Sequence, residues 1–117
     1  MGLKELYEKL LESGIPVWHY EAMQEAMPYA VYAETSTRYR HASGRLLEEV
    51  VSVEMAHVTD REFDPSLEKL KEVLAESKIA FSIVHSFVPE TKRIVSHFEF
   101  EIVRETTDMG GLEWANS

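Results

Sequence analysis

The sequence predicts an α+β fold, with a mainly antiparallel sheet of four to five strands and two helices on one of its faces. Three observations predict it: two segments with apolar residues three and four positions apart, several short β-branched and aromatic runs, and one strictly alternating segment. The expected element order is α-β-β-β-α-β-β. The 117 residues fit one domain, which we place at 1–103, and 104–117 form a C-terminal tail that we expect to be an interaction segment.

The first helix is predicted at the N-terminus, where apolar residues recur at helical spacing and form one stripe. Ser13 and Gly14 end this helix, and Pro16 prevents it from resuming. The stripe consists of Leu3, Leu6, Tyr7, Leu10 and Leu11.

The second helix is predicted in DPSLEKLKEVLAES. Asp64 suits the N-cap, and Pro65 suits the first helical position, where its missing N–H has no cost. The buried stripe of this helix is Leu67, Leu70 and Leu74, with Val73 beside it.

Five segments are predicted as strands. They are Val17 to Tyr20, Tyr29 to Thr35, Leu46 to Thr59, Ile79 to Val88 and Ile94 to Val103.

The last two strands form a hairpin, for which Pro89 suits the second position of a type I turn. Placing Val88 opposite Arg93 aligns Phe81 with Phe100 on one side. The opposite side then carries polar residues, and Glu99 and Glu101 are predicted to face a lumen or a subunit interface. This side comprises Ser82, Val84, His97, Glu99 and Glu101.

A polar arm is predicted from Ser36 to Gly44, because the segment is too long for a tight turn. It concentrates half of the six arginines within eight positions. Tyrosine and arginine are favoured at interface centres, so we expect the arm to contact a partner or another subunit. A solvated loop and a DNA-phosphate contact are the alternatives. The arm residues are Arg38, Tyr39, Arg40, His41 and Arg45.

The tail contributes two further interface candidates, Leu112 and Trp114. Both are apolar residues that lie outside every periodic segment. We expect them to dock on a partner or on another subunit.

The charge balance limits the possible partners. With 12 basic and 21 acidic residues, the net charge is −9. DNA binding draws its affinity from basic residues, so a chain this acidic is a poor candidate for gripping DNA. It suits a passage that DNA traverses without sticking. No apolar run approaches the ~20 residues of a membrane span, so no membrane partner is expected.

Catalytic, cofactor and metal sites are all expected to be absent. The chain has no cysteine, no Gly-x-Ser-x-Gly elbow and no glycine-rich phosphate loop. Five histidines occur, but the hairpin register puts His85 and His97 on opposite faces. The spacing of Asp60, Glu62 and Asp64 resembles the start of a calcium loop without its glycine and closing glutamate, which favours a helix cap.

The order of elements and several local phrases resemble the tail terminator proteins of long-tailed bacteriophages and prophages, also called tail completion or tail-to-head joining proteins. The phrases are SGIPV, PYAVYAET, DPSLEKLKEVL and HFEFEIV, and the resemblance covers about residues 3 to 103. The segment after Val103 lies outside the pattern.

The resemblance implies a non-enzymatic structural protein of the virion tail or neck that assembles in the host cytoplasm. Such proteins form a homo-oligomeric ring, usually of six copies, on the last ring of the tail tube. Their partners are the major tail tube protein and the head-completion or connector proteins, and DNA passes through the ring without specific binding.

Other functions remain open alternatives. Another phage head-tail connector or adaptor is the nearest one, and a ligand-binding α+β regulatory module is the second. A ligand-binding module requires a concave site with converging polar groups. A small hydrolase or isomerase would need clustered carboxylates or histidines in one cleft.

Overall fold

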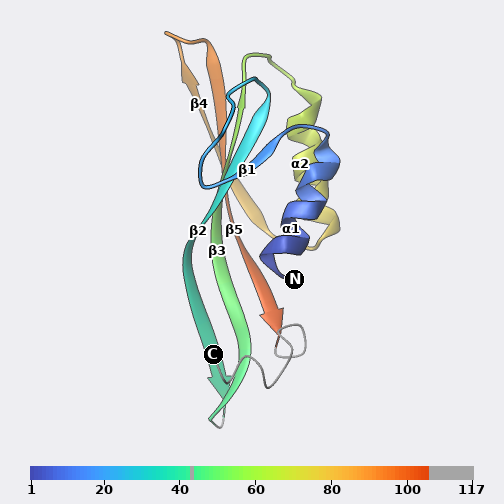
Figure 1. Ribbon diagram of the computed structural model, residues 1–117, viewed down its shortest axis with the longest axis vertical. Coiled ribbons are helices and arrows are strands. Elements are labelled where there is room, and N and C mark those ends of the chain that lie inside the picture. Colours follow the sequence, from blue (N-terminus) through green and yellow to red (C-terminus); the bar gives the residue numbers. More distant parts are fainter. Residues whose placement is uncertain (43, 106–117) are drawn as a thin grey trace.

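The computed structural model describes residues 1–42 and 44–105 and shows two layers: a five-stranded sheet, and two helices on one of its faces (Figure 1). The strand order is β1-β2-β3-β5-β4. Strand β1 runs parallel to β2, and the other neighbours are antiparallel. The predicted α+β class and element order are confirmed. The elements are α1 Leu3–Leu10, β1 Val17–His19, β2 Tyr29–Ala42, β3 Arg45–Thr59, α2 Pro65–Glu76, β4 Phe81–Val88 and β5 Arg93–Glu105.

The helices begin and end where the sequence places signals for them. Helix α1 passes into a 3-10 turn, Leu11–Ser13, and ends at Gly14, whose φ of 84° suits glycine. Helix α2 has Asp64 as its N-cap and Pro65 in its first turn. Neither described helix is long and apolar enough to cross a membrane.

The core lies between the helices and the sheet. Leu6 and Leu10 of α1, Leu70 and Leu74 of α2, and Phe98 of β5 are all fully buried. Each such side chain contributes about 1.5–3 kcal/mol on transfer from water. The helices therefore pack on the sheet through the predicted stripes, except at Leu11, which follows α1 and is 42% exposed.

The closing hairpin has the predicted register. Val88 lies opposite Arg93, Phe81 opposite Phe100, and Ile83 opposite Phe98. Strand β5 continues to Glu105, beyond the predicted end at Val103, and it pairs with β3 as far as Glu48.

The prediction of a polar arm from Ser36 to Gly44 is wrong. Strand β2 continues to Ala42 and pairs with β3, whose first residue is Arg45. The strand pattern was missed because both faces of this segment are exposed and polar, so no apolar alternation marks it. Gly44, with a φ of 75°, lies in the turn between the two strands.

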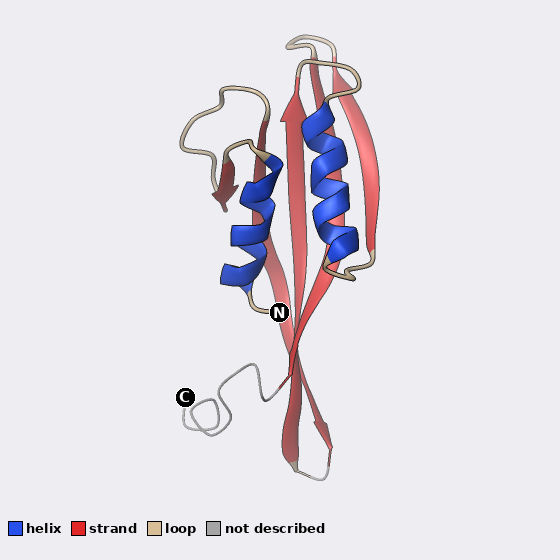
Figure 2. Cartoon of the chain, turned by 90° about the vertical axis from the view of Figure 1, so that its right-hand side faces the viewer, coloured by secondary structure: helices blue, strands red, loops and turns tan. Residues whose placement is uncertain are grey.

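The molecule is elongated, with extents of 53 × 25 × 23 Å. The β2–β3 hairpin projects beyond both helices, as Figure 2 shows. Because β5 ends opposite Glu48, the last part of this hairpin is only two strands wide. We call residues 36–42 and 44–50 the distal hairpin.

Candidate subunit interface

The sheet face away from the helices, which we call the open face, is polar near its centre. Glu54, Ser82 and Glu99 form one row across β3, β5 and β4. Thr35, Ser52 and Glu101 complete a shallow depression of about 340 Å³. The predicted open-face residues thus share one surface.

Arg38 joins the distal hairpin to this surface. Its guanidinium lies 2.7 Å from the Glu101 carboxylate, although β3 runs between their two strands. Small Ser52 lies opposite Glu101 on that intervening strand. The hydrogen bond from Arg38 lowers the pKa of Glu101 below its usual value. A residue of the predicted arm, Arg38, therefore contacts a residue of the predicted polar sheet face, Glu101.

The other arm residues are exposed along the distal hairpin. Arg40 donates to Glu48 at 3.1 Å, and Tyr39 is 44% exposed. His41 and Arg45 are exposed near the tip. The exposed ion pair of Arg40 contributes little stability, so its loss on contact with another molecule would cost little.

Two carboxylates on the open face oppose one another. Glu54 lies directly across from Glu99 on the neighbouring strand, and both are exposed. Like charges in this position destabilise a sheet. Within residues 1–42 and 44–105, neither has a basic partner within ion-pair distance.

Strand β4 forms one edge of the sheet, and its outer side pairs with no described strand. Its sequence, FSIVHSFV, contains neither charge nor proline. Val84 is 67% exposed and Phe87 is 59% exposed. Edges with these properties readily accept another strand.

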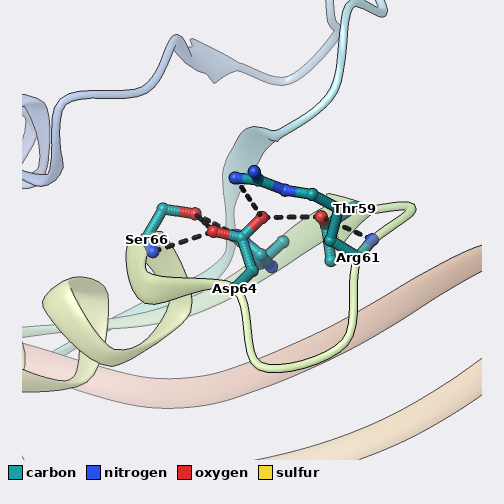
Figure 3. Close-up of polar contacts among 5 residues, drawn as sticks. Thr59, Arg61, Asp64 and Ser66 are labelled. Carbon is teal, nitrogen blue, oxygen red and sulfur yellow. Dashed lines mark hydrogen bonds and ion pairs between the residues drawn. The ribbon is translucent and has the colours of Figure 1, made fainter.

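The loop between β3 and α2 is held by Asp64, which is buried (Figure 3). Asp64 accepts hydrogen bonds from the Thr59 hydroxyl at 2.6 Å and from the Ser66 hydroxyl at 2.7 Å. Burial acts to raise the pKa of Asp64, but these hydrogen bonds outweigh it and the pKa is lowered. The expected capping role of this acidic segment is therefore confirmed. Phe63, in the same loop, is 98% exposed.

One polar cluster has no signal in the sequence. The His19 ring stacks on Tyr32 and contacts the Glu34 carboxylate at 2.9 Å, which ties β1 to β2. Burial acts to raise the pKa of Glu34, but hydrogen bonds from Tyr20 and His19 outweigh it and the pKa is lowered. The residues of this cluster come from β1, from Tyr20 directly after it and from β2, at spacings that no motif fixes.

The remaining site predictions concern metal ligands and the C-terminal tail. Across the described ranges, no group of three histidine or acidic side chains is placed to hold a metal ion. His97 pairs with Val84 and His85 with Ser96, which puts the two histidines on opposite faces as predicted. Leu112 and Trp114 lie outside the described residues.

Comparison with known protein families and with curated proteins finds no match for this chain.

Proposed function

We propose that this chain is a structural protein of a bacteriophage tail. It forms a ring, with six copies as the expected number, that caps the tail tube, ends tube polymerisation and joins the tail to the head. Its partners are other copies of itself, the major tail tube protein, and the head-completion or connector proteins. DNA passes through the ring without specific binding. The proposal rests on the resemblance to tail terminator proteins and on the shape of the subunit.

The observation that carries the proposal is the projecting distal hairpin. It extends past the two-layer body (Figure 2). Arg38, Tyr39 and Arg40 of this hairpin are exposed. A hairpin that leaves its own core gains little from intramolecular burial. It is well suited to reach a neighbouring subunit or a tube protein.

The charge distribution supports the same function. The net charge is −9, and the open face carries Glu54, Glu99 and Glu101 close together. A wall of this charge would repel DNA phosphates and keep the DNA mobile. Basic surfaces bind nucleic acid largely because they release counterions from the phosphates, and an acidic wall would gain none of this free energy.

Charge reversal on the distal hairpin tests the proposal. In a phage that depends on this chain, Arg38→Glu combined with Arg40→Glu should reduce infectious particles on the order of a hundredfold or more. The expected cause is loss of ring formation or of tail joining. Infectious titre, together with images of the particles, measures the effect.

A matched control separates this effect from net charge alone. Lys4→Glu with Lys69→Glu makes the same charge change at exposed helix positions and should leave the titre unchanged. The ion pairs lost in the test variant are exposed and worth up to about 1 kcal/mol each, so its unfolding midpoint should change little. Normal titre from a folded test variant would contradict the proposal. Particles blocked at a step other than tail capping would favour another connector role.

A further inference from the structure

We propose that two copies of this chain pair through their β4 edges about a two-fold axis, which joins their sheets into one continuous sheet with five strands from each copy. We call this pair the β4 dimer. A two-fold contact presents the same surface on both copies and closes at two, so it is not the contact that repeats around a ring. The β4 dimer is therefore a form of the free chain before assembly, and it goes beyond the proposed function.

Strand β4 lacks the features that protect edge strands. It is eight residues long, and its register with β5 runs from Phe81 to Val88 without a bulge. It contains no proline, acidic residue, lysine or arginine. Natural proteins protect exposed edges with short strands, bulges, prolines or charges. An edge with none of these features is suited to pairing with another strand.

This edge is also accessible. In Figure 2, the strand that follows α2 is the outermost element on its side of the molecule. Residues 84–88 are all exposed, and within the described ranges the outer side of β4 pairs with no strand. A second strand can therefore approach in the plane of the sheet without displacing a described element.

The sequence of β4 indicates that this second strand is another β4. It reads nearly the same in both directions about Val84, because the residues three positions away are both phenylalanine and those two positions away are both serine. Antiparallel pairing about a two-fold axis at Val84 sets each residue opposite its counterpart in the other copy. Aromatic pairs and serine pairs in directly opposite positions stabilise a sheet. The opposed pairs are Phe81 with Phe87, Ser82 with Ser86, Ile83 with His85, and Val84 with Val84.

Other two-fold registers match less well. Residues directly opposite in a sheet share a face, so the axis must pass at a residue and not between two residues. An axis at His85 would oppose two imidazoles and set Ser82 against Val88. An axis at Ile83 would shorten the pairing to residues 81–85. The axis at Val84 gives the longest pairing of like with like.

Charge favours the same edge. Each copy carries a net charge of −9, so two copies repel one another over most of their surfaces. Strands β2, β3 and β5 all contain charged residues, whereas β4 contains no acidic residue, lysine or arginine. Val84 and Phe87, which are 67% and 59% exposed, would lose contact with water in the β4 dimer. The neutral edge is thus the long strand surface at which two acidic copies meet at least cost.

A single cysteine tests the axis, since the chain has no cysteine of its own. In the β4 dimer the two Val84 residues are directly opposite, with Cα atoms about 4.5–5.5 Å apart. This separation suits a disulfide. Mild oxidation of the purified Val84→Cys chain should therefore give disulfide-linked dimers.

Ser82→Cys is the matched control, because Ser82 is exposed on the same strand and the same face. In the proposed register the two Ser82 residues lie four positions apart along the strands, ~14 Å, which no disulfide spans. This variant should give on the order of tenfold less cross-linking than Val84→Cys. Stronger cross-linking through Ser82→Cys would overturn the register.

Opposite charges at Val84 give a second test. Val84 is 67% exposed, so neither Val84→Lys nor Val84→Glu disturbs the core. Each change places like charges opposite one another at the axis and should weaken dimerisation on the order of tenfold or more. An equal mixture of the two variants should associate again, because opposite charges then meet. Sedimentation of the unmodified chain, of each variant and of the mixture measures these effects.

The outcomes separate the β4 dimer from the proposed function. Unmodified chain that sediments as single copies, or a mixture that associates no better than its two components, would overturn the β4 dimer and leave the ring standing. Cross-linked Val84→Cys dimers of a chain that never caps tail tubes would support the β4 dimer and contradict the function. Rings that form in solution without any Val84→Cys cross-link would also overturn the β4 dimer.

Discussion

At the scale of single residues, His57 is a buried histidine in one defined protonation state. It is fully buried, and its Nε2 lies 2.8 Å from the Ser66 hydroxyl oxygen. That hydroxyl donates its own hydrogen to Asp64, so it accepts from His57, and the imidazole is neutral with its proton on Nε2. The Nδ1 atom is buried without a partner. A second proton would therefore have no acceptor.

Acidification should destabilise the fold through this residue. Burial lowers the pKa of His57 below its ordinary value of 6.5, although Asp64 partly opposes the shift. Below pH 6.5 the unfolded chain therefore binds more protons than the folded chain. The stabilising contribution of neutral His57 is fully present above that pH, and it is lost as the pH falls toward the folded-state pKa. Between pH 7 and 5 the loss can reach about 2 kcal/mol.

Urea unfolding of the chain and of His57→Gln at pH 7 and 5 measures this contribution. The glutamine amide retains a donor toward Ser66 but does not titrate. The variant should show a smaller loss of unfolding free energy between the two pH values. An equal loss in both proteins would contradict the assignment.

At the scale of elements, the β2–β3 hairpin contains two regions of different stability. Near α1 and α2, residues such as Val53 and Met55 are buried and their strand is paired on both sides. From Glu48 to the tip the hairpin has only two strands, and Tyr39, Arg40, His41, Arg45 and Leu47 are exposed. Isolated two-stranded hairpins are marginally stable in water.

Amide hydrogen exchange should reveal this difference. In the monomer, amides of residues 39–42 and 45–47 should exchange on the order of a hundredfold faster than those of residues 51–57. Ring assembly through the distal hairpin, as proposed, should then slow exchange in this hairpin. Uniform protection along β3 in the monomer would contradict the two-region description.

The success of sequence prediction also varied by element. The face of β5 was predictable because Phe98 and Phe100 alternate with polar residues, and the Pro89 turn, which places Val88 opposite Arg93, then fixed the register. The distal part of β2 was not, because Arg38, Tyr39 and Arg40 are all exposed and give no apolar period. Continuous pairing with β3, a long-range interaction, fixes that segment as a strand.

The candidate interface was predicted in parts. The sequence indicated the arginine-rich segment and the Glu99 and Glu101 surface separately. Only the fold shows that Arg38 reaches Glu101, because this contact depends on the order of β2, β3 and β5 in the sheet. The exposed edge of β4 likewise follows from its place in the sheet.

At the scale of the whole molecule, the two faces of the sheet differ: the helices bury one face and leave the other exposed to solvent over much of its area. The helices cover one sheet face and bury Leu6, Leu70 and Phe98. No described helix covers the open face, and the outer side of β4 pairs with no described strand (Figure 1). A subunit with these features is suited to assembly with further copies, which is the basis of the proposed ring.

Electron microscopy of the purified chain mixed with phage tail tubes tests the central claim most directly. The account predicts closed rings seated at one end of each tube, and tubes that no longer lengthen when tube protein is added. Uncapped tubes that continue to grow beside dispersed single copies of the chain would contradict it.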